Sequence, residues 1–293
     1  MTKAVLGVIG GSGLYDMPGL ENRETRSFET AWGTPSAPLV FGTLNGTDMV
    51  FMPRHSGGHT IPPSDINYRA NIDAMKQAGV TDLLSVSACG SFKDELSPGT
   101  FVIIDQFIDR TFARVKSFFG AGCVAHVSMA HPISPLLADR AEAAAKAEGI
   151  PVSKGGTYLA MEGPQFSSLA ESLLYKQWGC GVIGMTNMPE AKLAREAELC
   201  YATVAMVTDY DSWHEGHGEV DIQAIIQVMH ANVAKARALL EAVIPRLTER
   251  PEACPEGCDR ALEYAIITDP SARDPALVAK LDAVAGRVLG KAA

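Results

Sequence analysis

The 293-residue chain has few cysteines, few aromatic residues and fewer basic than acidic side chains, and these shortages exclude several classes of protein. Six cysteines scattered over this length do not make a disulfide framework, and they favour a reducing, cytoplasmic location. The 25 lysines and arginines stand against 34 aspartates and glutamates, so the net charge of −9 argues against non-specific nucleic-acid binding. No apolar run approaches a membrane span, and MTKAVLGVIGG lacks the apolar stretch of a secretory signal.

Two of the cysteines, Cys254 and Cys258, lie close together in the segment RPEACPEGC. Their spacing would allow a disulfide or two metal ligands. No second pair of ligands accompanies them, so free thiols are the expected state.

Short apolar runs alternate with helical patterns along most of the chain. The expected strands are 4–9, 38–44, 49–52, 83–87, 101–105, 181–185 and 201–207, and the expected helices are 64–79, 134–149, 167–178 and 221–244. This alternation predicts an α/β fold in one domain, 1–293, with a mixed central sheet flanked by helices. The Pro- and Glu-rich stretch from about residue 248 predicts a peripheral C-terminal segment.

Helix boundaries follow from capping residues. Ser64, after two prolines, and Ser134, before Pro135, are expected N-caps. The long helix is expected to stop at Pro245.

Two carboxylates, Asp209 and Asp211, directly follow the apolar run 201–207. Side chains alternate along a strand, so both point the same way from its polar end. Like charges this close favour a raised pKa for one of them, as expulsion of a nitrogen leaving group requires. A turn with helix-capping aspartates is the alternative on local sequence alone.

Small polar residues and one arginine follow four of the expected strands. Glycines around Ser12 could turn backbone amides toward an anion, and Arg54 could clamp a phosphate with two parallel hydrogen bonds. The other candidates are His55, Ser87, Ala88, Met185 and Thr186. Neither a Walker nor a dinucleotide fingerprint is present, so free phosphate is favoured over ATP or NAD.

A metal site is the competing interpretation of the aspartate segment. His214, Glu215 and His217 follow the two aspartates, but the two histidines lack the i, i+4 spacing that places a pair on one helix face. No metal and no cofactor is expected, although a metal-dependent hydrolase remains an alternative.

Ordered motifs along the chain resemble one family. GVIGGSGLYD, RHSGGHTIPPSDINYRANI, SACGSFKDELSPG, DQFIDRT, EGPQFSSLAES, MTNMPEAKLARE and CYATVAMVTDYDSW are similar to the 5′-methylthioadenosine phosphorylase branch of the trimeric purine nucleoside phosphorylase family. The resemblance runs to about Pro245. It implies phosphorolysis of 5′-methylthioadenosine to adenine and 5-methylthioribose 1-phosphate, in purine and methionine salvage, by a homotrimer without cofactor.

The resemblance also implies roles for individual residues. Phosphate would be held by Ser12, Arg54, His55, Ser87, the amide of Ala88 and Thr186. The nucleoside would contact Phe166, Met185, Asp209, Tyr210 and Asp211, with Asp209 protonating N7 of the base. Specificity positions would be Ser167 and Ile222, with Ile226 beside Ile222 on the 5′-methylthio pocket, while His126 would reach a neighbouring subunit's site.

The sequence departs from the family pattern at two positions and leaves one alternative open. Ser12 replaces a common threonine, and Gly57 stands where an arginine is frequent, which removes a charge near the phosphate and bears on selectivity against sulfate. A 6-oxopurine phosphorylase is the nearest alternative because Asn187 lies near the base in the family. The two aspartates favour a 6-aminopurine, since a carboxylate facing a carbonyl would pair two acceptors.

Overall fold

The computed structural model describes residues 4–11, 13–14, 17–214, 222–247 and 253–290, without the side chains of residues 222 and 224. Within these residues no helix is long and apolar enough to span a membrane.

The described strands form one mixed sheet of eleven strands, as the α/β prediction required. The main path runs β2-β3-β4-β1-β5-β10-β9-β7, and β11, β6 and β8 branch from β5. The strands are β1 Val5–Gly10, β2 Glu21–Arg26, β3 Leu39–Leu44, β4 Thr47–Pro53, β5 Asp82–Ser91, β6 Phe101–Ile103, β7 Gln106–Asp109, β8 Val152–Lys154, β9 Thr157–Ala160, β10 Val182–Gly184 and β11 Cys200–Tyr210.

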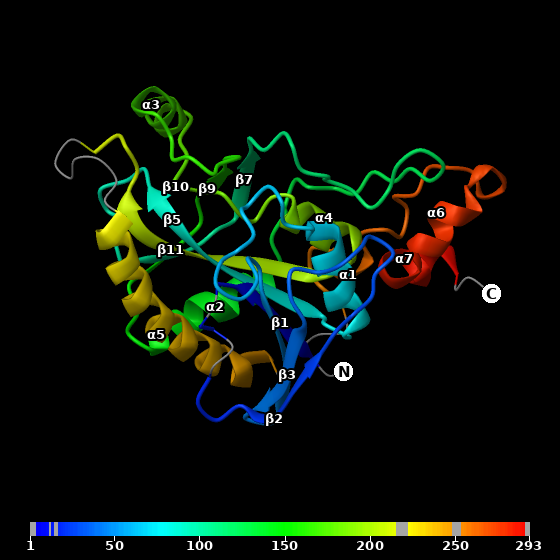
Figure 1. Cartoon of the computed structure of the whole chain (residues 1–293), viewed down its shortest axis with the longest axis horizontal. Coiled ribbons are helices and arrows are strands. Elements are labelled where there is room, and N and C mark those ends of the chain that lie inside the picture. The colour runs from blue at the N-terminus through cyan, green and yellow to red at the C-terminus, as the bar shows by residue number, and fades with distance from the viewer. Residues whose placement is uncertain (1–3, 12, 15–16, 215–221, 248–252, 291–293) are drawn as a thin grey trace.

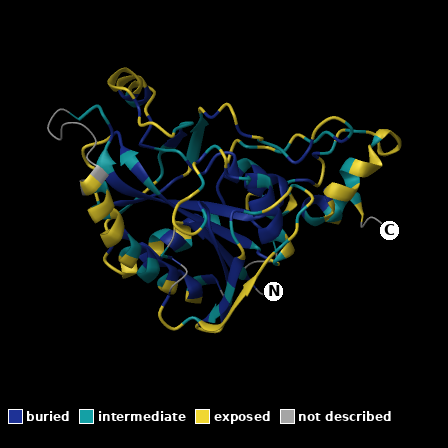
Figure 2. Cartoon of the chain, viewed as in Figure 1, coloured by how far each residue is buried: buried dark blue, intermediate teal, exposed yellow. Residues whose placement is uncertain are grey.

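Helices cover the sheet on its flanks (Figure 1). They are α1 Tyr68–Gln77, α2 Pro135–Ala147, α3 Leu169–Gln177, α4 Glu190–Glu196, α5 Ile222–Leu247, α6 Pro275–Lys280 and α7 Asp282–Leu289, with short 3₁₀ turns at Cys258–Arg260 and Pro270–Ala272. Helix α2 packs against α5 and β11, whereas α1 packs against α4 and α7. The central strands β1, β5 and β11 consist mostly of buried residues (Figure 2).

Strand β5 lies at the centre and has partners on both edges. Strand β11 pairs with it in parallel from Asp82 to Ser91 along one edge. On the other edge, β1 pairs with residues 82–85 and β10 with residues 90–91. Residues 86–89 therefore lie between two partner strands, and such a change of strand partners at the carboxyl end of a parallel strand is where α/β sheets bind ligands.

The predicted N-cap of α2 is confirmed, whereas the predicted start of α1 and the predicted end of α5 are wrong. Ser134 caps α2, and Pro135 occupies its first turn. Ser64 is not an N-cap: α1 starts at Tyr68 with Asn67 as the cap, and the Ser64 hydroxyl contacts Glu162 instead. Helix α5 continues through Pro245 to Leu247, because a proline near the end of a helix removes only one hydrogen bond of the last turns.

Several elements carry no pattern that predicts them. Strand β2 has the sequence ENRETR, and every side chain in it is exposed, so no apolar alternation marks it. Strands β7, β8 and β9 have only three or four residues each.

The described C-terminal segment is anchored to the main body. Leu281, Val284 and Ala285 belong to the hydrophobic core, and Arg287 pairs with the buried carboxylate of Glu198 at 2.7 Å. All six cysteines of the chain are free thiols.

Cys254 and Cys258 pack with Cys200 in a small buried cluster. Neither cysteine is in a disulfide, and the described residues contain no group of three or more potential ligands suited to a metal ion.

Candidate active site

A cavity of about 310 Å³ opens at the carboxyl ends of β1, β4, β5, β10 and β11 and is closed on one side by α5. Nine of the predicted residues line it: Arg54, His55, Ser87, Ala88, Phe166, Met185, Thr186, Asp209 and Asp211. The topology explains why residues so distant in sequence meet here, since most of them follow strands that end at the same edge of the sheet.

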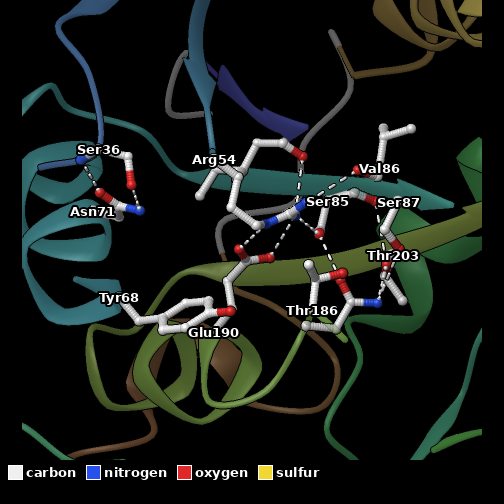
Figure 3. Close-up of polar contacts among 12 residues, drawn as sticks. Ser36, Arg54, Tyr68, Asn71, Ser85, Val86, Ser87, Thr186, Glu190 and Thr203 are labelled. Atoms are coloured by element: carbon white, nitrogen blue, oxygen red, sulfur yellow. Dashed lines mark hydrogen bonds and ion pairs between the residues drawn. The ribbon is translucent and has the colours of Figure 1, made fainter. Parts of the chain in front are cut away.

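Arg54 is almost fully buried, and its charge is matched inside the protein. Its Nε and Nη2 donate to the two carboxylate oxygens of Glu190 at 2.9 and 3.2 Å, and Nη2 also donates to Ser85 Oγ at 2.6 Å (Figure 3). Nη1 donates to the Val86 carbonyl at 3.3 Å. The expected two-bond clamp on phosphate is therefore wrong for this guanidinium: Glu190 occupies its bidentate edge, because a buried cation requires a buried counter-charge.

Asn187 lies beneath the pocket rather than in it. Its side chain is fully buried, it accepts from Ser85 Oγ at 2.9 Å, and it donates to Thr203 Oγ1 at 3.0 Å and to Ser87 Oγ at 3.5 Å. Asn187 is not among the residues that line the cavity, where the base is expected. Its amide instead ties the Arg54 network to Ser87.

His55 is buried at the rim of the same region, and its ring stacks on that of His59 with centroids 4.1 Å apart. Its Nδ1 lies 2.9 Å from the Ile61 carbonyl, which can only accept, so Nδ1 carries the proton of the neutral ring. Burial, followed by the charge of Arg54, lowers the pKa of His55 to about 4. The ring is neutral at physiological pH, and its Nε2 is an acceptor.

The open stretch of β5 directs backbone groups toward the cavity. The Val86 carbonyl points to Arg54, whereas the Cys89 carbonyl accepts from Thr208 on β11. Because backbone groups alternate between the two edges of a strand, the amide of Ala88 points to the same edge as Val86, into the gap between β1 and β10. Ser87 and Thr186, both nearly buried, add hydroxyl groups beside it.

Asp209 and Asp211 lie together at the opposite end of the cavity, as the strand alternation predicts. A register shift between Val207 and Asp209, at Thr208, interrupts the pairing of β11 with β5. Burial is the main cause that raises the pKa of Asp209 to about 6, and the charge of Asp211 adds to it. The pKa of Asp211 is also raised by burial. The raised pKa is confirmed, but desolvation rather than charge repulsion dominates.

The carboxylate of Asp211 is buried, and hydrogen bonding from Ser172, Ser167 and the backbone of Ser212 opposes the effect of burial on its pKa. Asp211 also lines the cavity, where a carboxylate can only accept hydrogen bonds.

Apolar side chains form the rest of the wall. Phe166 and Met185 lie there as predicted, together with Met161. Helix α5 contributes Ile225, Met229 and Val233, at positions i, i+4 and i+8 of one face. Ile226 is 46% exposed and does not line the cavity, so its prediction as a cavity residue is wrong. Its neighbour Ile225 lines the cavity instead.

The remaining predicted residues lie away from the cavity or outside the residues that the structure describes. Ser12 and the side chain of Ile222 lie outside the described residues. Tyr210 does not line the cavity and donates to the Asp94 carbonyl, while Ser167 lies behind the wall, with its hydroxyl 3.7 Å from the Met161 sulfur. His126 is exposed, and its backbone amide donates to the Ala265 carbonyl, away from the cavity.

Among the described residues, His214 does not join the aspartate pair in a group of potential metal ligands. The His214 ring stacks on Tyr210 and lies 3.2 Å from Asp94, not against the aspartate pair. Glu215 and His217 lie outside the described residues.

A comparison with models of known protein families covers all the residues that line the cavity. The model of the phosphorylase superfamily matches residues 5–245, which include every described cavity residue. The chain belongs to the phosphorylase superfamily. The match ends within α5, so the C-terminal helices α6 and α7 lie beyond the superfamily segment.

Individual superfamily members are similar over nearly the full length. The S-methyl-5′-thioadenosine phosphorylase of Bradyrhizobium diazoefficiens is 63% identical over 289 residues, covering 99% of each chain. A crystal structure of a methylthioadenosine phosphorylase from an antarctic soil metagenomic library has a TM-score of 0.91 at 43% identity and covers 97% of this chain and 99% of its own. The methylthioadenosine phosphorylase of Schistosoma mansoni in complex with adenine has a TM-score of 0.85 at 32% identity, covering 90% and 99%.

Sequence reasoning missed several residues of this superfamily site. Glu190 follows Pro189 at the start of α4 and resembles an ordinary exposed acid of a first helical turn, so nothing in the sequence signals its burial. His59 lies in the glycine-rich loop after β4, and its ring contact with His55 could not be foreseen. Met229 could have been found from the 3.6-residue period if the phase of α5 had been known.

Proposed function

We propose that this protein catalyses the phosphorolysis of 5′-methylthioadenosine by inorganic phosphate, giving adenine and 5-methylthioribose 1-phosphate. The observation that carries the proposal is the position of Asp209 and Asp211 in one cavity with Arg54, Ser87 and Thr186. An acid able to protonate a purine and a group of anion-binding donors thus face a common space. The near full-length similarity to a phosphorylase of that name supports the same substrate.

In this reaction the phosphate oxygen attacks the anomeric carbon as the bond to the base breaks. The donors at the phosphate end would be Ser87 and Thr186 hydroxyls, the Ala88 amide and the remaining N–H of Arg54 Nη1, with Ser12 expected beside them. Their role is to hold the nucleophile in line with the anomeric carbon, which lowers the entropic part of the barrier.

At the other end Asp209 would donate its proton to N7 of the departing adenine. A pKa of about 6 leaves a fraction of the carboxyl protonated near neutrality, which suits a general acid. The carboxylate of Asp211, which lines the cavity, is an acceptor suited to the 6-amino group of adenine and unsuited to a 6-oxo group. This favours an adenine nucleoside over the 6-oxopurine alternative.

The apolar face of α5 would contact the 5′-methylthio group. Ile225, Met229 and Val233 offer no hydrogen-bond partner to a 5′-hydroxyl, so a thioether is favoured there. Phe166 and Met185 would contact the sugar and base.

We also propose a homotrimer in the cytoplasm that needs no metal or cofactor. Large apolar side chains are exposed on α3, at Leu169, Leu173 and Leu174, and at Phe112 in the long segment after β7. Such a group of exposed apolar residues is typical of a subunit interface. Six free thiols agree with a reducing compartment.

The test is base release by EDTA-treated protein from 5′-methylthioadenosine, methylthioinosine, adenosine and inosine, with and without phosphate. Adenine release from methylthioadenosine only in the presence of phosphate would support the proposal. Faster hypoxanthine release would indicate the 6-oxopurine alternative, and phosphate-independent or EDTA-sensitive release would contradict the assigned chemistry. Sedimentation of the same sample tests the trimer.

A further inference from the structure

A buried ion pair that the proposed reaction does not use lies behind the apolar wall of the cavity. Arg114 Nε is 3.3 Å from Glu162 Oε1, and the exposed fractions of the two side chains are 1% and 11%. Neither is among the described residues that line the cavity. Burial of such a pair is costly unless further hydrogen bonds satisfy both groups, so the other partners of Arg114 and Glu162 indicate what the pair holds in place.

The guanidinium of Arg114 joins two loops of the wall. Its Nη2 donates to the Glu162 carbonyl at 2.8 Å, in the loop between β9 and α3. Its Nη1 donates to the Met188 carbonyl at 2.6 Å, in the loop between β10 and α4. The first loop carries Phe166 and the second carries Met185, and both of these residues line the cavity. One planar cation with donors in a fixed geometry thus sets the separation of the two loops.

The carboxylate of Glu162 holds two further segments at the same place. Its Oε2 accepts from the backbone amides of Phe112 and Ala113, in the segment after β7. Its Oε1 accepts from the hydroxyl of Ser64, which follows the cavity residue Pro63. A carboxylate can accept on both oxygens at once, whereas an amide has only one acceptor oxygen.

The two loops of the wall are closely packed against each other. Gly163 follows Glu162 with a φ of +70°, and a Cβ at this position would lie 2.5 Å from the Met185 sulfur. Close-packed groups transmit displacements, so a shift of the Glu162 backbone moves a side chain that lines the cavity.

The anion end has a separate anchor. The side chain of Asn187, next to Thr186, is held by Ser85 on β5 and by Thr203 on β11. These hydrogen bonds come from the sheet and not from the ion pair behind the wall. Loss of that pair should therefore disturb the nucleoside end more than the anion end.

We propose that Arg114 and Glu162 are positioning residues that set the geometry of the nucleoside wall from behind, through the loops that carry Phe166 and Met185. This inference rests on the proposed function and adds two residues that do not touch the substrate. The wall contacts the sugar and base before and during bond cleavage alike. Loss of the pair therefore weakens nucleoside binding, with a small effect on kcat.

The experiment compares the KM for 5′-methylthioadenosine and the KM for phosphate in the wild-type protein and in Glu162→Gln. The amide places an N–H group against one set of donors, so it cannot hold both segments. We expect the nucleoside KM to rise about tenfold, and the phosphate KM and kcat to change by less than about threefold. Calorimetric titration with 5′-methylthioadenosine in the absence of phosphate should show the same loss of affinity.

Two further variants separate positioning from stability. Ser64→Ala removes one donor to the same carboxylate, a milder change that should raise the nucleoside KM about threefold. Glu198→Gln is the matched control, because Glu198 is also a buried carboxylate paired with an arginine, Arg287, but it is not among the described residues that line the cavity. The control should lower the melting temperature and leave both KM values unchanged. Thermal unfolding of all three variants establishes that they are folded.

An unchanged nucleoside KM in Ser64→Ala would overturn the inference, as would equal rises of the two KM values in Glu162→Gln. A rise of the nucleoside KM in Glu198→Gln as large as that in Glu162→Gln would overturn it too. These outcomes are separate from failure of the proposed function. Wild-type protein that shows no phosphate-dependent adenine release would reject the proposed function, whereas active wild-type protein without the expected difference between the two KM values would reject the inference alone.

Discussion

The two ends of the cavity are built differently. At the anion end Arg54 is 1% exposed, and its hydrogen bonds are largely taken by Glu190, Ser85 and Val86. At the nucleoside end Phe166 is 49% exposed and Met229 is 38% exposed. The anion end is organised before any ligand binds, whereas the nucleoside end gains its contacts from the ligand.

The largest expected effect is at Asp209, and it tests the assignment of the nucleoside end. We expect Asp209→Asn to lower kcat by about 100- to 10,000-fold, because the amide cannot supply the proton as the glycosidic bond breaks. Nucleoside binding, measured by calorimetry, should change far less. An unchanged kcat would remove the assigned role from Asp209.

A large effect on stability is expected at the anion end. Glu190→Gln leaves Arg54 buried without its counter-charge and should lower the free energy of unfolding by about 3–5 kcal/mol. The matched control is Tyr201→Phe, which removes one hydrogen bond to Glu190 and should cost about 1 kcal/mol. Urea unfolding measures both, and equal costs would mean that the ion pair does not organise this end.

A smaller effect with a distinct pH dependence is expected again at Asp209. Its folded pKa of about 6 lies above the ordinary value of 3.8, so the stability linked to this proton is present below about pH 4 and is lost as pH rises through 6. Asp209→Asn should therefore gain stability over the wild-type protein between pH 4 and pH 8, by on the order of 2 kcal/mol. Urea unfolding at both values checks this, and a pH-independent difference would contradict the raised pKa.

The smallest effect is expected on the apolar wall. Met229→Ser should reduce the preference for 5′-methylthioadenosine over adenosine in kcat/KM by about tenfold, because a hydroxyl can pair with the 5′-hydroxyl of adenosine. Ile226→Ser, at an exposed position of α5 outside the cavity, is the control and should leave the preference unchanged. Equal losses in both variants would show that the wall has been assigned to the wrong face.

The sequence predicted the residues that follow apolar strands, because strand ends at one sheet edge converge. Asp209 and Ser87 belong to this class. It could not predict Glu190, whose role depends on burial beside Arg54 across 136 residues of chain. Strand β2 was not predicted because an exposed polar edge strand has no alternation, and Ile226 was misplaced because a 3.6-residue period fixes spacing but not which face meets the site.

The register shift in β11 has a consequence for how this site is recognised in any sequence. Met206 lines the cavity before the shift, and Asp209 and Asp211 line it after, so the cavity-facing positions change from even to odd numbers at Thr208. If Thr208 were instead paired with Gly90 in a regular ladder, Asp209 and Asp211 would lie on the face opposite to that of Met206, with no change in the Asp-x-Asp spacing. An aspartate pair is therefore diagnostic only when its offset from the preceding strand is also correct.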